Sequence, residues 1–498
     1  MAIMECVIEK QREIPVIATP EILIAGAGPA GIGAAIAAAR SGVKTMLVER
    51  YGFPGGNLTT AMVNPFFTFH DEKGNQVIRG IAEEFVDRMK QRGASLGHVA
   101  DLTFDNASMT PFDAERAKII LIEMLEEAGV ELLFHTWIVD ANVTNGVVES
   151  VVIENKSGRQ AICPQYIVDC TGDADVAAFS GAPFAKGKED DGSMQPATLY
   201  FRVGGVDVTQ LRNWMKENRN LLKDSPNDEQ IEKQKAIAFL GMNQLVQEAK
   251  DSGMLHSEVA PRILMYELPL PGIFCINTTR IQNIDGTKTV DITRAEIALR
   301  KQVLEVHTFL QKHIGGFENS YILDTGIQVG IRETRRIAGD YVLTEEEVLN
   351  STSFEDGIAC GTFAIDIHPP HGKKQIFTGS GKSVYEIPYR CLVPKDLTNL
   401  LVAGRPISAT HIAHGSIRVM ATCTAMGQAA GVAVAMACHN KCGTREINIK
   451  QLRKELVEQG QYLLNENIEE MVDPDLILES ENSDGQKAMH YNPFRTKK

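Results

Sequence analysis

The chain has 498 residues, of which 44% are hydrophobic and 23% are charged, and its formal net charge is −14. This length is more than one simple hydrophobic core supports, so two or three domains are expected. The acidic balance argues against a nucleic-acid backbone as the main partner. The nine cysteines contain no CxxC pair, which gives no support for a zinc ribbon or a thioredoxin-type redox pair, and no metal site is predicted.

The N-terminal segment does not read as a signal peptide. Residues 1–15 mix acids with bases and contain no long apolar run. The odd, scattered cysteines are typical of reduced thiols. We therefore expect a cytoplasmic protein.

A strand, a tight turn, a helix and a second strand are predicted in that order between Ile22 and Arg50. The helical run is rich in alanine, the strongest helix former, and the second strand ends at Glu49. A GxGxxG pattern at the turn would let a pyrophosphate approach the helix N-terminus, and its glycines are Gly26, Gly28 and Gly31. Glu49 stands where an acid accepts hydrogen bonds from a ribose. The unit therefore predicts dinucleotide binding.

A Pro-Gly-Gly loop follows this acid directly. Gly55 and Gly56 would let a cofactor lie against the backbone, and Asn57 and Thr60 offer hydrogen bonds. A plain turn is the alternative interpretation, because turns favour the same residue types.

The next elements are predicted to extend a parallel sheet. A helix is expected over Ile81–Arg92, and the isolated histidines His70 and His98 are assigned to the surface. A further helix is capped by Asp113 and is followed by a strand over Val130–His135. Antiparallel hairpins are predicted over residues 137–162, and the strand after them ends in a Thr-Gly-Asp motif that suits a position beside the nucleotide.

The middle of the chain reads as a second domain inserted into the first. Residues 207–257 are predicted to be mostly helical and polar, and residues 291–314 form a clear amphipathic helix. The domain boundaries expected are 1–195 and 396–460 for the nucleotide-binding domain, 196–395 for the inserted α+β substrate domain, and 461–498 for a tail.

A final strand over residues 399–403 leads into a long helix over residues 419–437 that is dense in alanine and glycine. The helix is nearly long enough to span a membrane, but Thr422, Thr424 and Gln428 interrupt it. Close packing through Gly427 and Gly431 is the favoured interpretation, and no membrane association is expected.

Four motifs occur in an order that resembles flavoproteins of the glutathione reductase fold type. They are GAGPAG with its distant acid, GGN, TGD and LLVAGR. Three longer segments are more specific, namely GIRETRRIAGDYVLT from Gly330, YEIPYRCL from Tyr385 and GRPISATHIAHGSIRVMATCTAMGQAAG from Gly404. They resemble the FAD-dependent oxidoreductase family of bacteria and archaea. The resemblance implies an α/β fold with a Rossmann-like FAD-binding domain of that type.

The resemblance also implies FAD as the resident cofactor. The histidine that carries covalent flavin in some relatives is replaced, since Asn57 and Leu58 follow Gly56, so FAD is expected to be non-covalent. The implied cofactor-binding residues are Gly26, Gly28, Pro29, Ala30, Gly31, Glu49, Arg50, Gly55, Gly56, Asn57, Thr60, Val139, Thr171, Gly172, Asp173, Gly404, Arg405, Gly415, Ser416, Ile417 and Arg418.

The expected activity is hydride transfer between a small organic substrate, such as a hydroxy- or carboxylate-bearing metabolite or a sugar, and flavin N5. Histidine would act as the base and arginine would orient an anion. The candidate catalytic residues are Arg332, Arg335, His368, Tyr389, Arg390 and His411. For the RETRR segment, an internal ion-pair network is an equal alternative.

Two other functions are weighed against this one. A flavin-dependent RNA-modifying or RNA-binding protein would need a basic stripe that the sequence lacks. A plain NAD-dependent dehydrogenase is disfavoured by the TGD and LLVAGR motifs. A homodimer is the fold-level expectation. The substrate and the electron donor or acceptor are not specified by the sequence.

Overall fold

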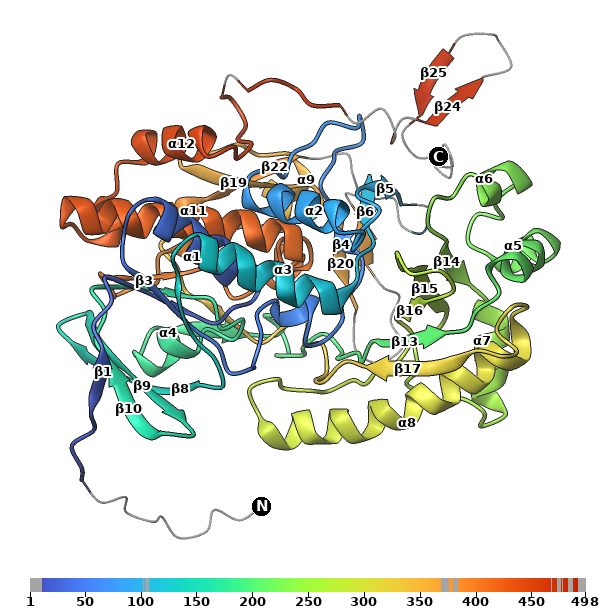
Figure 1. Cartoon of the computed structure of the whole chain (residues 1–498), viewed down its shortest axis with the longest axis horizontal. Coiled ribbons are helices and arrows are strands. Elements are labelled where there is room, and N and C mark those ends of the chain that lie inside the picture. Colours follow the sequence, from blue (N-terminus) through green and yellow to red (C-terminus); the bar gives the residue numbers. More distant parts are fainter. Residues whose placement is uncertain are drawn as a thin grey trace.

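The computed structural model describes residues 11–101, 103, 107–368, 376–378, 384–466, 468–472 and 476, and the backbone of residues 478–481 and 487–490. Two regions with separate hydrophobic cores make up the molecule, the first on the left and the second on the right of Figure 1.

A five-stranded parallel sheet organises the first region, in the order β23-β11-β2-β3-β7. Its strands are β2 (Ile22–Ala25), β3 (Thr45–Val48), β7 (Glu131–Leu133), β11 (Tyr166–Asp169) and β23 (Leu400–Val402). All four residues of the central strand β2 are buried, as expected of a strand covered on both faces. The predicted strand before the Thr-Gly-Asp motif is β11 and the predicted final strand is β23, and both are part of this sheet.

Helices α1 (Pro29–Arg40) and α11 (Met420–Asn440) pack directly against each other beside this sheet (Figure 1). A Cβ added at Gly427 would lie 1.9 Å from the carbonyl oxygen of Ala30, and one at Gly431 would lie 2.3 Å from that of Ala34. The two backbones can approach so closely only because these positions are glycine, so the predicted close packing is confirmed.

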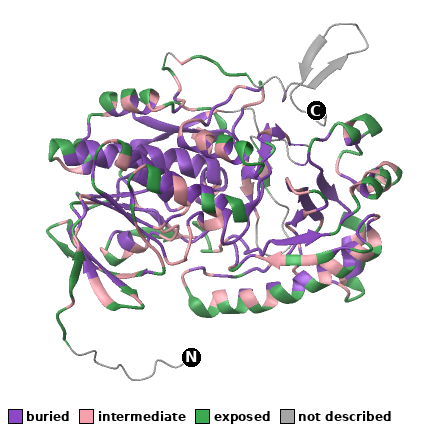
Figure 2. Cartoon of the chain, viewed as in Figure 1, coloured by how far each residue is buried: buried purple, intermediate pink, exposed green. Residues whose placement is uncertain are grey.

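The long apolar helix α11 is the one described helix that is long and apolar enough to cross a membrane. Its 18-residue apolar window is 100% buried inside the protein. Figure 2 shows it buried along almost its whole length. A core helix of a globular protein passes the same test of length and composition.

Around these elements lie α2 (Ile81–Gln91), α3 (Ala114–Glu127) and a small sheet of β4 (Phe66–Phe67), β5 (Val99–Ala100) and β6 (Ser108–Thr110). Asp113 caps α3 as predicted, because its side chain accepts a hydrogen bond from the backbone of Glu115. The surface assignment of two histidines was wrong. His70 is buried against Ser108, and the His98 ring lies between Thr110 and Glu83, so tertiary hydrogen bonds hold both inside.

The predicted hairpins form a four-stranded sheet in the order β1-β10-β9-β8. Its strands are β1 (Val16–Ala18), β8 (Trp137–Thr144), β9 (Val147–Asn155) and β10 (Gly158–Ile162). The short helix α4 (Asp175–Phe179) follows the Thr-Gly-Asp motif.

The second region is a five-stranded sheet in the order β14-β15-β16-β13-β17, with helices around it. Its strands are β13 (Phe201–Gly204), β14 (Ala238–Gly241), β15 (Ile263–Glu267), β16 (Phe274–Ile276) and β17 (Tyr321–Thr325), and its helices are α5 (Val208–Glu217), α6 (Asp228–Glu232), α7 (Asn243–Asp251) and α8 (Thr289–His313). The predicted amphipathic helix is α8, which runs along the sheet in Figure 1. Strand β14 lies inside the stretch that was expected to be helical.

The predicted end of the inserted domain at residue 395 differs from the division of the cores. The second core ends near Val329 and Ile331, and the apolar residues from Leu343 to Val393 pack into the first core. The returning elements are β18 (Arg335–Ile337), α9 (Glu345–Leu349), β19 (Gly357–Gly361), β20 (Ile365–Ile367), β21 (Ile376–Thr378) and β22 (Tyr385–Pro388). Strand β18 pairs with β12 (Phe184–Lys186), which comes before the second region in the chain. The returning segment has ordinary composition, so the sequence carries no mark of the boundary.

The remaining elements complete the chain. They are α10 (His411–Ile417), α12 (Ile449–Glu458), β24 (Leu478–Glu481), β25 (Lys487–His490) and the 3₁₀ turns Gly56–Leu58, Arg219–Leu221, Tyr389–Leu392 and Thr444–Glu446.

Candidate active site

A cavity of about 510 Å³ opens where the carboxyl ends of β2, β11 and β23 meet the N-terminus of α1. Gly26 has φ +94°, a conformation that favours glycine, and Gly31 is needed because a Cβ there would lie 1.8 Å from the Gly26 carbonyl oxygen. A Cβ at Gly28 would meet no atom within 4 Å, since this residue faces the open cavity. The turn therefore leaves the α1 N-terminus accessible to an anion.

Glu49 lies at the tip of β3 and lines the same cavity. Its two carboxylate oxygens accept hydrogen bonds from the backbone N–H groups of Ala27, at 2.7 Å, and Tyr51, at 3.0 Å. These bonds fix the carboxylate beside the glycine turn and leave acceptor capacity for hydroxyl groups. Burial raises the pKa of Glu49 above its ordinary value.

The Gly-Gly loop packs against the glycine turn. Gly55 and Gly56 have φ of +121° and +49°, and a Cβ at Gly56 would lie 2.8 Å from the Cα of Gly28. Thr60 closes the loop because its hydroxyl donates to the Gly56 carbonyl oxygen at 2.6 Å. The loop is a tight turn, and it also forms a wall of the cavity through Gly56, Asn57 and Thr60.

The opposite wall is charged. Arg405 pairs with Asp173 at 2.6 Å and donates to the Gly172 carbonyl oxygen at 2.7 Å. Arg335 pairs with Asp175 at 2.8 Å. Burial, with the nearby Asp173 charge, raises the pKa of Asp175 to about 6. The wall thus places two arginine side chains in the cavity, and the N-terminus of α1 also favours the binding of phosphate there.

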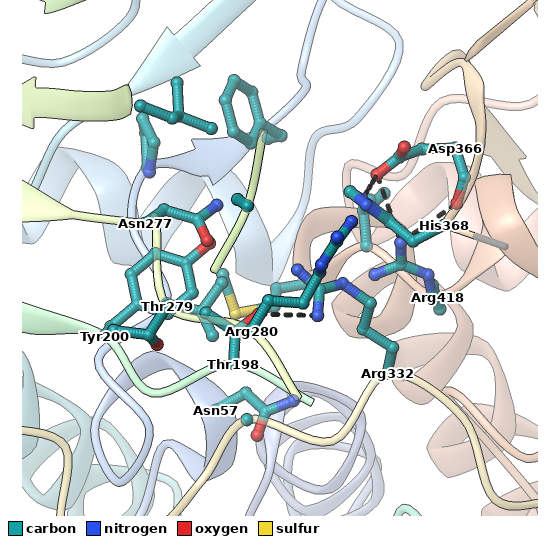
Figure 3. Close-up of a pocket in the computed structure, with 18 of the residues that line it drawn as sticks. Asn57, Thr198, Tyr200, Asn277, Thr279, Arg280, Arg332, Asp366, His368 and Arg418 are labelled. Atoms are coloured by element: carbon teal, nitrogen blue, oxygen red, sulfur yellow. Dashed lines mark hydrogen bonds and ion pairs between the residues drawn. The ribbon is translucent and has the colours of Figure 1, made fainter. Parts of the chain in front are cut away.

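A second cavity, of about 540 Å³, adjoins the first and lies between the two regions. The two cavities share five lining residues, namely Asn57, Ile331, Arg405, Arg418 and Met420. Strands and loops of the second region supply its far side, including Tyr200, Asn277 and Arg280 (Figure 3).

Arginine side chains dominate the polar part of the second cavity. Arg332 donates to the Pro196 carbonyl oxygen at 2.6 Å and to the Thr198 hydroxyl at 2.7 Å, and Arg280 donates to the Glu258 carbonyl oxygen at 3.0 Å. Neither forms an ion pair with any described residue. Burial and the neighbouring charge of Arg418 lower the pKa of Arg332 to about 10, so it stays protonated at neutral pH.

A carboxylate, an imidazole and a guanidinium form a group on one side of this cavity (Figure 3). His368 Nε2 lies 3.1 Å from Asp366 Oδ2, and Arg418 donates to the Asp366 backbone carbonyl at 3.1 Å. Burial lowers the pKa of His368 to about 4, although Asp366 acts in the opposite direction. The imidazole is therefore neutral at neutral pH and can accept a proton, with a carboxylate in place to stabilise the charge that forms.

One comparison decides the family. Residues 21–456 match the family described as FAD dependent oxidoreductase. The chain belongs to the FAD-dependent oxidoreductase family. Its cofactor is FAD. The residues present fit this group, because an open glycine turn, a buried acid at the end of β3 and a second adjoining cavity are what a dinucleotide with a reactive ring requires.

Solved structures with similar folds are remote in sequence. A geranylgeranyl bacteriochlorophyll reductase-like protein from Thermoplasma acidophilum is 12% identical with a TM-score of 0.42, covering 89% of this chain and 84% of its own. The p-nitrophenol 4-monooxygenase PnpA from Pseudomonas putida is 10% identical with a TM-score of 0.42, covering 89% and 86%. A flavoprotein/dehydrogenase from Cytophaga hutchinsonii is 14% identical with a TM-score of 0.40, covering 89% and 83%. A comparison with curated protein sequences gives no match.

Most residues predicted to bind FAD line the first cavity, hereafter the FAD cavity. They are Gly26, Gly28, Pro29, Ala30, Glu49, Arg50, Gly56, Asn57, Thr60, Thr171, Gly172, Asp173, Gly404, Arg405 and Arg418. Gly31 and Gly55 do not line it but shape the two turns that do.

Four further predicted cofactor residues do not line the FAD cavity. Val139 lies on β8, where Trp137 two residues earlier reaches the cavity instead. Gly415 packs against Ile367, and Ile417 is fully buried. The Ser416 hydroxyl donates to the Phe363 carbonyl oxygen at 2.5 Å, so it is used in the core.

The structure separates the predicted catalytic residues. Arg332 and His368 line the second cavity, whereas Arg335 lines the FAD cavity. The other three line neither cavity. Tyr389 is buried and donates to the Thr444 carbonyl oxygen at 2.7 Å, and the half-exposed Arg390 pairs with Asp356 at 2.8 Å.

The third of these, His411, belongs to an internal network. Its Nδ1 lies 2.8 Å from the buried carboxylate of Glu333, which also pairs with Arg336. Within the RETRR segment, Glu333 and Arg336 thus form the internal ion pair that was the alternative prediction. Arg332 is not part of it and lines the second cavity instead.

Sequence reasoning missed the contribution of the second region to both cavities. Residues from α8 and the segment before Arg332 line the FAD cavity, among them Thr289, Glu296 and Gln328. In the second cavity, Arg262, Arg280 and Tyr200 were missed. No local motif marks these residues.

Proposed function

We propose that this protein is a dehydrogenase or reductase that moves a hydride between flavin N5 and a small organic acid bound in the second cavity, hereafter the substrate cavity. The observation that carries the proposal is the junction of the two cavities at Asn57, Arg405 and Arg418. FAD, when bound, supplies the hydride acceptor or donor. The junction gives a second molecule access to the cofactor from the substrate cavity.

The arginines of the substrate cavity favour an anionic substrate. No described carboxylate forms a direct ion pair with Arg280 or Arg332, and the two guanidinium groups repel each other. A carboxylate would relieve the repulsion between them and would accept paired N–H bonds from a guanidinium. The same pairing would fix which carbon of the substrate is presented at the junction.

His368 is the proposed base. When a substrate carbon gives up a hydride, the hydroxyl or amine attached to that carbon must lose a proton. The neutral imidazole of His368 can take that proton. Asp366 then stabilises the imidazolium through the contact at 3.1 Å. In the reverse direction the same pair returns the proton.

The chain is proposed to hold FAD without a covalent bond. Among the described residues that line the FAD cavity there is no histidine, and its two cysteines are Cys170 and Cys423. Burial raises the pKa of Cys170 far above its ordinary value and that of Cys423 to about 12, so neither is a reactive thiolate.

The first test is the visible spectrum of the purified protein before and after acid precipitation. Flavin absorbance that moves completely into the supernatant supports non-covalent FAD. Absorbance that stays with the precipitate contradicts it.

The second test is anaerobic bleaching of the flavin bands by a panel of hydroxy acids, amino acids and neutral alcohols. The proposal expects bleaching by an acid and no bleaching by its amide or ester. An Arg332→Met variant that keeps its FAD should need an acid concentration at least tenfold higher to reach the same degree of bleaching. Bleaching only by uncharged compounds would contradict the proposal.

A further inference from the structure

Four aromatic side chains that contact one another in succession line the substrate cavity, and they are here named the aromatic wall: Phe67, Tyr266, Phe363 and Phe377. The ring of Phe67 lies 6.0 Å from that of Tyr266 and 5.8 Å from that of Phe363, and Phe363 lies 6.4 Å from Phe377. These centroid distances are typical of aromatic pairs in edge-to-face or tilted contact.

The surroundings of the aromatic wall are apolar. Val63, Pro65, Leu264 and Met420 line the cavity with it. The one hydroxyl on the wall, that of Tyr266, lies 3.3 Å from the hydroxyl of Thr103. Sugar hydroxyls placed here would lose hydrogen bonds to water and find few side-chain partners, which costs about 1–3 kcal/mol for each group left unsatisfied.

The same cavity carries the arginines described above. Arg280 and Arg332 lie between the group of Tyr200, Asn277 and Thr279 and the group around His368 (Figure 3). The cavity is therefore amphiphilic. It offers cations for an acid group and flat apolar rings for the rest of the ligand. Its volume, about 540 Å³, lies within the ~300–1,000 Å³ of pockets that enclose drug-sized ligands.

We propose that the substrate is an aromatic carboxylic acid, with its carboxylate on Arg280 and Arg332 and its ring on the aromatic wall. This inference rests on the proposed function, since it names the substrate class of the same site. The oxidisable carbon would lie between acid and ring, as in an aromatic 2-hydroxy or 2-amino acid. Oxidation removes a hydride from that carbon to the flavin and a proton from its hydroxyl or amine to His368, leaving a carbonyl or imine.

The test uses ligands that cannot react, so binding is measured apart from catalysis. The holoenzyme is titrated with 2-naphthoate, and the shift of the flavin absorption bands is followed. Matched ligands are 2-naphthamide, which lacks the charge, cyclohexanecarboxylate, which lacks the aromatic ring, and gluconate, which replaces the ring with hydroxyl groups. We expect 2-naphthoate to bind at least tenfold more tightly than each of the three.

Two variants divide the interaction. Arg280→Gln should weaken 2-naphthoate at least tenfold and leave 2-naphthamide within twofold. Phe363→Leu should weaken both naphthyl ligands and leave cyclohexanecarboxylate within twofold. Retained flavin absorbance shows that each variant is folded, and Arg280→Lys and Phe363→Tyr are the conservative replacements expected to recover part of the affinity.

The outcomes separate this inference from the proposed function. Tight, charge-dependent binding of 2-naphthoate without bleaching by any aromatic hydroxy or amino acid would support the cavity assignment and contradict hydride transfer. Bleaching by gluconate or an aliphatic hydroxy acid, with no binding or competition by 2-naphthoate, would support hydride transfer and overturn the aromatic substrate. Equal binding of cyclohexanecarboxylate and 2-naphthoate would also overturn it.

Discussion

The protonation state of single residues decides what the substrate cavity can do. His368 and Asp366 are close enough to share a hydrogen bond, and burial keeps the imidazole uncharged. Arg332 keeps its charge although burial and the nearby Arg418 lower its pKa to about 10. The cavity thus combines a neutral base with a permanent cation, which suits deprotonation of an anion-bearing substrate at neutral pH.

Replacing His368 by Gln should slow flavin reduction by about 100-fold or more, because positioned bases contribute about 10²–10⁴-fold. FAD absorbance should be retained, since His368 does not line the FAD cavity. Single-turnover anaerobic stopped flow with the identified substrate measures the rate. The exposed His439→Gln is the matched control and should react at the parent rate. An unchanged rate in His368→Gln would remove it as the base.

The pH dependence has a defined sign. The folded pKa of His368, about 4, is lowered from its ordinary value, so the base is active above this value and is lost as pH falls through it. The reduction rate should therefore show an acid limb near pH 4 that disappears in His368→Gln. Below about pH 6.5 the His368 imidazole is protonated in the unfolded chain but stays neutral in the folded protein. His368 therefore lowers the free energy of unfolding as the pH falls below that value.

Gly28 and Gly31 of the GxGxxG turn are glycine for different physical reasons. Gly28→Ala adds a Cβ that meets no protein atom within 4 Å, whereas Gly31→Ala places one 1.8 Å from a carbonyl oxygen. Gly28→Ala should leave the melting temperature of the apoprotein unchanged and weaken FAD at least tenfold. Gly31→Ala should lower the melting temperature of both forms. FAD fluorescence titration and thermal unfolding measure these effects, and normal FAD affinity in Gly28→Ala would place the cofactor elsewhere.

Among the elements, the contact between α1 and α11 controls the geometry of the FAD cavity. Helix α1 points its N-terminus at that cavity, and α11 fixes its position through backbone contact at glycines. A larger residue at this contact would displace the turn as well as the helix.

Gly431→Ala should cost about 1–3 kcal/mol of unfolding free energy, the range for overpacked cores, because its Cβ would lie 2.3 Å from the Ala34 carbonyl oxygen. FAD affinity should fall with it. Urea unfolding measures the first effect and fluorescence titration the second. Lys454→Ala, at an exposed position of α12, is the control and should stay within about 0.5 kcal/mol of the parent protein. An unchanged unfolding free energy in Gly431→Ala would mean that α1 and α11 can move apart at little cost.

At the scale of the whole molecule, the FAD cavity has walls from both hydrophobic cores. Gln328 and Glu296 come from the second region, and the glycine turn comes from the first. Bound FAD therefore links the two regions, and ligand binding adds about 2.7 kcal/mol at 100 times the dissociation constant.

Calorimetry should accordingly show one unfolding transition for the holoprotein and two for the apoprotein. The lower of the two transitions should move upward as FAD is added, until it merges with the other. A single apoprotein transition that merely shifts with FAD would show that the cores unfold together without it.

The sequence predicted features that depend on local backbone conformation, such as the glycine turn. It did not predict contacts between residues that are far apart in the chain. Gly26, Gly28 and Gly31 have local conformational causes, so the turn and the parallel strands around it could be predicted. Val139 was chosen on β8, but Trp137 is the residue of that strand that lines the cavity, and the sequence does not mark which residue of the strand reaches it. Tyr389, Arg390 and His411 were plausible as polar residues near motifs, but their partners lie far away in the chain. The arginines of the second region belong to no motif.

The contact between α1 and α11 joins segments that lie at opposite ends of the sequence, and this limits how the gene can be divided. A fragment that stops at residue 195 would contain the glycine turn and Glu49 but would lack α11 and β23, leaving the apolar side of α1 and one edge of β11 open to water. The nucleotide-binding half of this protein is thus not a detachable module. A split protein or a chimera would keep its FAD only if both segments were supplied together.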